Sequence, residues 1–208
     1  MLSRINSQIA EIYNERFLKL GPTPEASMWF SKTRQIARFD VIFNQLKLFR
    51  QRNSISISDV GCGYGAFLEY LLENKIDEEV SYYGYDVCPE VIKFCKKKYF
   101  ERAFFFTKSF PIHKTDFVTM SGTFNFFPTQ DYNAWRTYFF NSLKLLWSEA
   151  KCAMIFNLQI SNLATITPGG IVYAAQDEVE QFCKTNCGNV RAINNPMIPK
   201  DKTFVVSK

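Results

Sequence analysis

The chain has 208 residues, of which 47% are hydrophobic and 22% charged, and its formal net charge at pH 7 is +5. This length fits about one domain on a prior of roughly 100–200 residues per domain, and the composition excludes wholesale disorder. Neither a secretory leader nor a run of about 18 apolar residues is visible, which predicts a cytoplasmic protein without a membrane span.

Neither the positive charge nor the cysteines indicate a nucleic-acid or metal site. The one dense basic run lies over residues 93–98, at the end of an expected helix, where cations favour the helix dipole and face solvent. We interpret it as a solvated surface, which disfavours a nucleic-acid partner. The six cysteines contain no Cys-x-x-Cys pair of the kind found in structural zinc sites, so we interpret them as reduced, mostly buried thiols.

The first fifty residues have the spacing of helices. Apolar residues recur at helical intervals from Ile5 to Phe17, the Gly-Pro-Thr-Pro sequence at 21–24 breaks the pattern, and a second stripe runs from residue 25 to about residue 49. We expect residues 1–52 to form a helical lid that carries Trp29 and Arg38 over the site. The alternative is plain helix packing. Residues 53–208 should form one compact domain together with this extension.

From residue 54 onward, short apolar strands alternate with amphipathic helices, a pattern typical of a mostly parallel α/β sheet. We predict seven strands, over residues 55–60, 80–87, 103–107, 116–121, 153–158, 190–194 and 203–206. Helices are predicted over residues 65–74, 89–99, 131–150 and 176–186. The connection between the last two strands is too short for a crossover helix, so these strands should pair antiparallel.

A glycine-rich turn follows the first predicted strand and carries the strongest functional signal. Residues 59–65 read Asp-Val-Gly-Cys-Gly-Tyr-Gly and lead directly into a helix. Glycines allow a tight turn and close approach of the backbone to a ligand, and free amides at a helix start can donate to it. The spacing Gly-x-Gly-x-Gly disfavours NAD, whose fingerprint is Gly-x-Gly-x-x-Gly. The acidic Asp59 beside the turn suits a ligand with an ammonium group better than one with phosphates.

Asp86 lies near the end of the second predicted strand, 21 residues after Gly65. In a Rossmann-type sheet this position lies beside the first turn, where a carboxylate can accept hydrogen bonds from both hydroxyls of a ribose. The alternative role is to cap the helix that begins near Pro89, and the two roles are compatible. Val87 would give an adenine ring an apolar face.

Three segments, residues 59–65, 83–87 and 116–122, resemble the first, second and fourth motifs of class I S-adenosylmethionine-dependent methyltransferases. Residues 28–208 resemble a bacterial subgroup of small methyltransferases of unknown acceptor. The resemblance implies S-adenosylmethionine as cofactor. It also implies a Rossmann-like seven-stranded sheet with the last strand antiparallel and helices on both faces. The cofactor-binding residues it implies are Asp59, Gly61, Cys62, Gly63, Gly65, Asp86, Val87, Ser109, Phe110, Ser121, Trp29 and Arg38.

The resemblance also implies roles for several of these residues. Asp59 would lie near the ammonium of the methionine portion, residues 61–63 would line that portion with their backbone, and Ser121 would face the sulfonium. After the third strand the family often has an Asp for the adenine amine. This chain has Lys-Ser-Phe at residues 108–110 instead, which leaves backbone atoms to make that contact.

The implied reaction is an in-line methyl transfer, which needs alignment and a dry pocket, and needs a base only for an acceptor such as a hydroxyl. His113, the sole histidine, is the candidate base, because we expect its loop near the carboxyl ends of the strands. The alternative is a solvent-exposed loop histidine.

The class of methyl acceptor is predicted from the residues that follow the fourth predicted strand. Residues 121–124 read Ser-Gly-Thr-Phe, where enzymes that modify bases or glutamine have an Asn-Pro-Pro-Tyr type of motif. This difference favours a small-molecule, glycan or lipid-linked acceptor. The alternatives are a non-catalytic binding protein of the same fold, an RNA methyltransferase and a nucleotide-dependent oxidoreductase.

Overall fold

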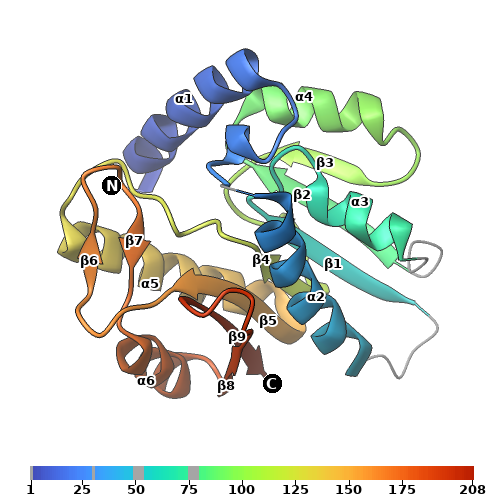
Figure 1. Ribbon diagram of the computed structural model, residues 1–208. Helices are drawn as coiled ribbons and strands as arrows, with labels where there is room; N and C mark the ends of the chain where they lie inside the picture. Colours follow the sequence, from blue (N-terminus) through green and yellow to red (C-terminus); the bar gives the residue numbers. More distant parts are fainter. Residues whose placement is uncertain (1, 30, 49–53, 75–79) are drawn as a thin grey trace.

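The computed structural model describes residues 2–29, 31–48, 54–74 and 80–208. Seven strands form one twisted sheet in the order β3-β2-β1-β4-β5-β9-β8 (Figure 1). Their bounds are β1 Ile55–Val60, β2 Val80–Asp86, β3 Phe104–Thr107, β4 Thr115–Met120, β5 Ala150–Gln159, β8 Asn189–Asn194 and β9 Asp201–Ser207. The expected boundary between residues 52 and 53 lies outside the described residues.

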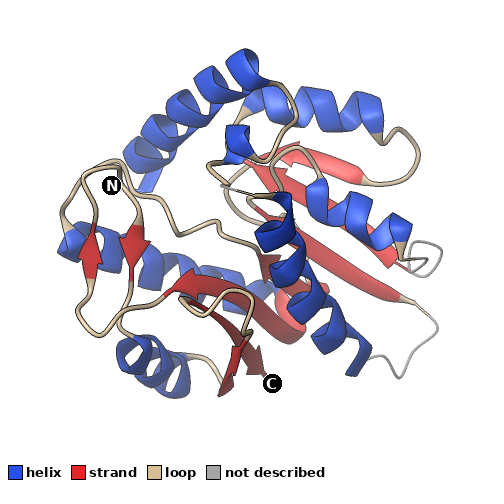
Figure 2. Cartoon of the chain, in the orientation of Figure 1, coloured by secondary structure: helices blue, strands red, loops and turns tan. Residues whose placement is uncertain are grey.

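Helices cover both faces of this sheet, as Figure 2 shows. The helical elements are α1 Leu2–Leu20, the 3-10 turn η1 Glu25–Ser27, α2 Lys32–Leu48, α3 Ala66–Glu73, α4 Pro89–Lys98, α5 Tyr132–Glu149 and α6 Gln176–Asn186. One core cluster joins α2, α3 and α4 to sheet residues such as Ile57, and the other joins α5 and α6 to residues such as Val118. Within the described ranges, no helix is both long and apolar enough to cross a membrane.

The predicted sheet is confirmed, including its one reversed strand. β1 pairs parallel with both β2 and β4, whereas β9 lies between β5 and β8 and pairs antiparallel with each. The strand ends differ from the predicted ends by up to three residues. Buried strands are the easiest to locate from sequence, since they read as continuous apolar runs bounded by turn residues.

A small hairpin was not predicted. β6 (Thr165–Ile166) and β7 (Val172–Tyr173) pair antiparallel within the segment that connects β5 to α6. Backbone bonds join this hairpin to the segment after β4: the Phe127 amide donates to the Gly170 carbonyl, and the Val172 amide donates to the Asn125 carbonyl, each at 2.9 Å. Strands of two residues are too short to produce an alternating pattern, so the sequence carries no signal for them.

The strand order creates a crevice at one place in the sheet. β1 and β4 are neighbours in the sheet, although β2 and β3 come between them in the sequence. The chain therefore continues from β1 toward one edge of the sheet, through β2 and β3, and from β4 toward the other edge, through β5. In open α/β sheets, ligands bind outside the carboxyl ends of the strands at such a switch point. The glycine-rich turn after β1 and the segment that begins at Ser121 after β4 both lie there.

Candidate functional site

The turn after β1 needs its glycines both for conformation and for space. Gly61, Gly63 and Gly65 have φ angles of 73°, 53° and 83°, in the left-handed region that side chains other than glycine rarely adopt. A Cβ on Gly61 would lie 2.6 Å from the side chain of Thr123, and one on Gly65 would lie 2.5 Å from the ring of Tyr99. The close contacts explain why this turn could not carry larger residues.

The amides of this turn are not free, contrary to our expectation. The amides of Gly61 and Cys62 both donate to the carbonyl of Tyr85, at 2.7 and 3.0 Å, and the amide of Gly63 donates to Asp86 Oδ2 at 2.9 Å. Backbone donors in a buried turn need partners, and the end of β2 supplies them. The three amides therefore hold the turn against β2.

Asp86 points at the glycine turn and has acceptor capacity to spare. One carboxylate oxygen accepts from Gly63, and the other accepts from the amide of Cys88 at 2.9 Å. Each oxygen has two lone pairs, so the carboxylate can still accept from a ligand. Burial raises the pKa of this carboxyl group. Asp86 also supports the start of α4, whose N-cap residue is Cys88, so the capping alternative describes part of its role.

Asp59 lies at the floor of the crevice. Its side chain accepts hydrogen bonds from the hydroxyl of Tyr82 and, at 3.2 Å, from Thr119 Oγ1. The residue is only 2% exposed, and desolvation raises the pKa of its carboxyl group to about 6. A carboxylate in such surroundings is costly to ionise, and a cationic ligand group would stabilise the ionised form.

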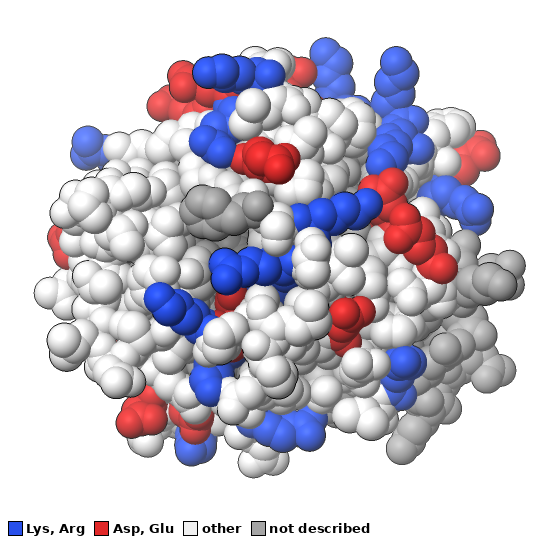
Figure 3. Space-filling model, in the orientation of Figure 1, with Lys and Arg blue, Asp and Glu red and all other residues white. Residues whose placement is uncertain are grey.

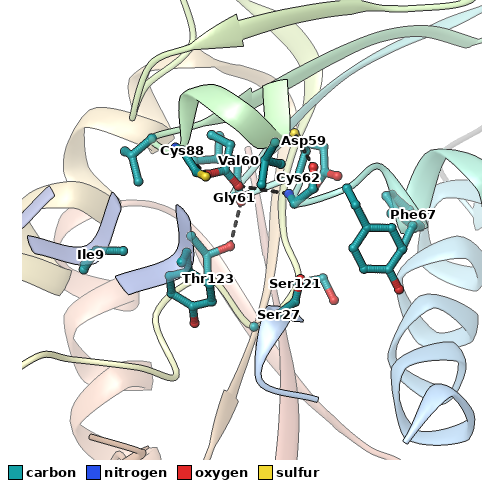
Figure 4. A pocket seen from close by; sticks show the side chains of 18 of the residues that line it. Ile9, Ser27, Asp59, Val60, Gly61, Cys62, Phe67, Cys88, Ser121 and Thr123 are labelled. Atoms are coloured by element: carbon teal, nitrogen blue, oxygen red, sulfur yellow. Dashed lines mark hydrogen bonds between the residues drawn. The ribbon is translucent and has the colours of Figure 1, made fainter. Parts of the chain in front are cut away.

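A main cavity opens above these residues, with a volume of about 1130 Å³ counted out to its mouth. Figure 4 shows Gly61 and Cys62 on one side of it, with Ile9 of α1 and Ser27 of η1 approaching from other elements. Thr123 Oγ1 donates to the carbonyl of Val60 at 2.6 Å. The buried Oγ of Ser121 finds no hydrogen-bond partner among the described residues. A polar atom left in this state is typical of a site that a ligand completes.

The structure brings ten of the twelve predicted cofactor residues to this cavity. They are Trp29, Asp59, Gly61, Cys62, Gly63, Asp86, Val87, Ser109, Phe110 and Ser121. Gly65 does not line it, because it occupies the N-cap position of α3 beneath Tyr99. Arg38 also lies outside it, where it pairs with Asp201 at 2.5 Å and stacks over the ring of Trp29 at 4.0 Å.

His113 lies away from the cavity, and its expected placement near the carboxyl ends of the strands is wrong. Its ring packs edge-on against Tyr83 at 4.3 Å, and it precedes the first residue of β4 by two positions. The segment from residue 108 crosses back from the end of β3 to the start of β4. Only its first residues, 108–110, therefore line the cavity.

Helix α1 contributes cavity residues that the sequence analysis did not identify. Ile9, Tyr13 and Phe17 line the cavity. The helix reaches across it, from a ring contact between Phe17 and Phe94 of α4 to a hydrogen bond between Asn6 and Tyr138 of α5. These residues belong to a helical apolar stripe, which has no feature that separates a cavity wall from an ordinary core face.

Helix α2 differs from α1 in its placement. Phe39, Ile42 and Leu46 are buried in the core cluster that α2 shares with α3. The packing alternative therefore describes most of α2, although Gln35 and Phe39 also line the main cavity, as residues of α1 and η1 do.

Residues 57–145 match a family of known sequences described as "Methyltransferase domain", and a comparison with curated proteins found no significant match. Three similar solved structures are methyltransferases. Magnesium protoporphyrin IX methyltransferase from Synechocystis PCC 6803 with bound S-adenosylmethionine has 14% identity and a TM-score of 0.72, over 98% of this chain and 97% of that one. An S-adenosylmethionine-dependent methyltransferase from Leishmania major has 11% identity and a TM-score of 0.69, over 94% of this chain and 81% of that one. An S-adenosylmethionine-dependent methyltransferase from Aquifex aeolicus has 18% identity and a TM-score of 0.55, over 78% of this chain and 87% of that one.

At these identities, the structural likeness shows a shared fold. The sequence match covers the segment from β1 into α5, which includes the glycine turn, Asp86 and the residues after β4. Residues 57–145 therefore match a methyltransferase domain, and the whole chain has the fold of S-adenosylmethionine-dependent methyltransferases.

Proposed function

We propose that the chain transfers the methyl group of S-adenosylmethionine to a small-molecule acceptor, with the cofactor held in the main cavity. The observation that carries this proposal is the carboxylate of Asp86. It accepts from the amide of Gly63, lines the cavity and keeps acceptor capacity for a ligand. A ribose presents two neighbouring hydroxyl donors that fit such a carboxylate.

The other residues of the cavity suit the remaining parts of the cofactor. Val87 and Phe110 give an apolar surface beside Asp86 that fits an adenine ring. Asp59 offers a buried negative charge to the ammonium of the methionine portion. The unpartnered Oγ of Ser121 lies after β4, where the resemblance places the sulfonium.

S-adenosylmethionine supplies an electrophilic methyl group: the acceptor's lone pair bonds to the methyl carbon as the carbon–sulfur bond breaks, and that electron pair returns to sulfur. The protein's part is to align the two reactants and to exclude water. Arg16 serves this by donating to the carbonyls of Glu25 and Ala26, which fixes η1 at the cavity. Ser27 of η1 lies 3.4 Å from the position of a Cβ on Gly63.

The enclosure of the cavity favours a small acceptor. Because α1 reaches from α4 to α5, it narrows the approach of a folded macromolecule to the main cavity. The loop after β4 is in turn bonded to the hairpin of β6 and β7. These contacts leave a limited approach, which suits a small molecule better than a polymer.

Calorimetry with the full chain tests the proposal. We expect S-adenosylhomocysteine to bind at one site per chain and NAD to bind at least roughly a hundredfold more weakly, since the turn lacks the spacing that a pyrophosphate needs. Formation of S-adenosylhomocysteine from S-adenosylmethionine across an acceptor panel then tests turnover. Equal affinity for NAD, or no binding of S-adenosylhomocysteine, would contradict the proposal.

A matched pair of glycine variants tests whether the turn borders the ligand. Gly61 and Gly21 have nearly the same φ, 73° and 70°, but a Cβ on Gly21 meets nothing within 4 Å, whereas one on Gly61 meets Thr123 at 2.6 Å. Each Gly→Ala change should cost about 1–2 kcal/mol of stability through backbone strain, and Gly61→Ala should cost more because its Cβ displaces the Thr123 side chain. Only Gly61→Ala should also weaken S-adenosylhomocysteine binding, by roughly tenfold. Titration of both variants checks this, and equal affinities would show that the turn does not border the ligand.

A further inference from the structure

A second cavity adjoins the main one on the side of β4 and β5. The two cavities share Tyr13, Ser27, Trp29 and Gly122 as lining residues. From Gly122 the second cavity continues past Asn125 to the turn that precedes β9. Its inner end therefore lies next to the residues that face the proposed sulfonium position.

The second cavity carries an excess of positive charge. Arg34, Arg38 and Lys200 line it, and Asp201 is the one acidic residue among its described lining residues. Asp201 is already paired with Arg38 at 2.5 Å. Arg34 and Lys200 are exposed, and neither forms an ion pair with an acidic side chain in the described part of the chain. In Figure 3, Lys and Arg side chains gather near the middle of this face, over the start of α2 and the segment leading into β9.

Two buried donors in the wall of the same cavity have no partner among the described residues. They are Arg38 Nε and Asn125 Nδ2. Asn125 Oδ1 accepts from the amide of Gln159 at 3.1 Å, which fixes the side chain and leaves its NH₂ group unused. Both side chains lie near Gly122, where the two cavities meet. A buried donor without a partner destabilises the folded protein, so the arrangement favours a ligand that brings acceptor atoms.

Aromatic rings form much of the remaining wall. Tyr13, Trp29, Phe126 and Tyr173 line the cavity, and Tyr13 packs edge-on against Phe126 at 5.7 Å. The ammonium of Lys200 lies 5.9 Å from the centre of the Tyr173 ring. Rings placed in this way bind flat, apolar groups.

We propose that the second cavity binds the methyl acceptor, and that this acceptor is a ring-containing molecule with an anionic group, either a carboxylate or a phosphate. Arg34 and Lys200 hold the anionic group at the outer end. The aromatic walls hold the ring, and the methyl-accepting atom lies at the Gly122 end. This inference rests on the proposed function, because the main cavity must hold the methyl donor.

The test compares acids with neutral molecules of the same shape. The full chain is first saturated with S-adenosylhomocysteine. It is then titrated with indole-3-acetate and 4-hydroxybenzoate, with their neutral amides, and with phenyl phosphate against phenol. The double variant Arg34→Ala/Lys200→Ala removes two cations from the cavity. Lys96→Ala/Lys97→Ala is the matched control, because it removes two exposed cations from the end of α4.

We expect at least one acid to bind roughly tenfold more tightly than its neutral counterpart, the gain from about one charge-assisted hydrogen bond. Arg34→Ala/Lys200→Ala should abolish this preference without changing the affinity for S-adenosylhomocysteine, and the control should keep it. A preference for phenyl phosphate over the carboxylates would assign the anion as phosphate.

Three results would overturn the inference while S-adenosylhomocysteine still binds. They are equal binding of acids and neutral molecules, no binding of any acid, and the same loss in both double variants. If S-adenosylhomocysteine itself fails to bind the unmodified chain, the proposed function fails instead, so the two failures can be told apart.

Discussion

Asp86→Ala is expected to weaken the binding of S-adenosylhomocysteine by about a hundredfold. In the proposed complex, its carboxylate accepts hydrogen bonds from both ribose hydroxyls, and each charge-assisted bond contributes about 1.5–3 kcal/mol. A hundredfold loss corresponds to about 2.7 kcal/mol, slightly less than the sum of about 3–6 kcal/mol for two such bonds. The dissociation constant measured by calorimetry checks this prediction.

The same variant also changes stability, because Asp86 accepts from the amides of Gly63 and Cys88. Leaving these donors without their partner should lower the free energy of unfolding by about 1–3 kcal/mol. Denaturant unfolding therefore accompanies the titration, which is done where the variant is folded. Asp177→Ala is the control, because this exposed acid in the first turn of α6 removes the same charge far from the cavity. An affinity like that of the unmodified chain would exclude Asp86 from the ribose site.

The sheet and the glycine turn were predictable because their signals are local. Each parallel strand is a short apolar run, and Gly61, Gly63 and Gly65 stand where a tight turn needs positive φ. Asp86 was predictable because, in a Rossmann-type sheet, the end of β2 lies beside that turn.

The walls of the two cavities were not predictable, because they depend on contacts between distant segments. Arg38 was expected at the cofactor, but its pairing with Asp201 places it in the wall of the second cavity. Tyr13 belongs to an apolar helical stripe whose packing partner cannot be read from the pattern. The loop that holds His113 gave no indication of where it turns back toward β4.

The hydrogen-bond partners of the turn amides could not be predicted from the sequence either. Sequence indicates that donors are present at Gly61 and Gly63, but not that Tyr85 and Asp86 already accept from them. The ligand-binding groups of this turn are therefore to be sought in acidic side chains, which makes Asp59 the second residue to test.

Asp59→Asn is expected to raise stability and to weaken cofactor binding at the same time. The carboxyl group of Asp59 is 2% exposed, and its pKa is raised from 3.8 to about 6. This shift of about two units corresponds to a cost of about 3 kcal/mol for holding the ionised group in the folded protein. An asparagine is neutral, can accept from the Tyr82 hydroxyl and can donate to Thr119 Oγ1, so it should avoid most of this cost.

The pH dependence of the unfolding free energy tests whether the stability gained by Asp59→Asn comes from removing the buried charge. Between about pH 4 and pH 6 the folded protein binds more protons at Asp59 than the unfolded chain does, so its stability falls as pH rises through this range. The difference in unfolding free energy between Asp59→Asn and the unmodified chain should therefore grow from pH 4 to pH 6 and then stay constant. Asp201, whose pKa is also raised by burial, is present in both proteins and cancels in the difference.

Binding should change in the opposite direction, because the ionised Asp59 is the proposed partner of the cofactor's ammonium. We expect Asp59→Asn to weaken S-adenosylhomocysteine binding by about tenfold at pH 8, where the native carboxyl group is ionised. Urea unfolding from pH 4 to pH 8 and calorimetry at pH 8 check the two halves separately. A more stable variant with unchanged affinity would make Asp59 a structural residue only. A less stable variant at pH 8 would show that its hydrogen bonds require the charge. Opposite changes in stability and affinity would mean that the fold keeps a costly buried charge because the ligand uses it.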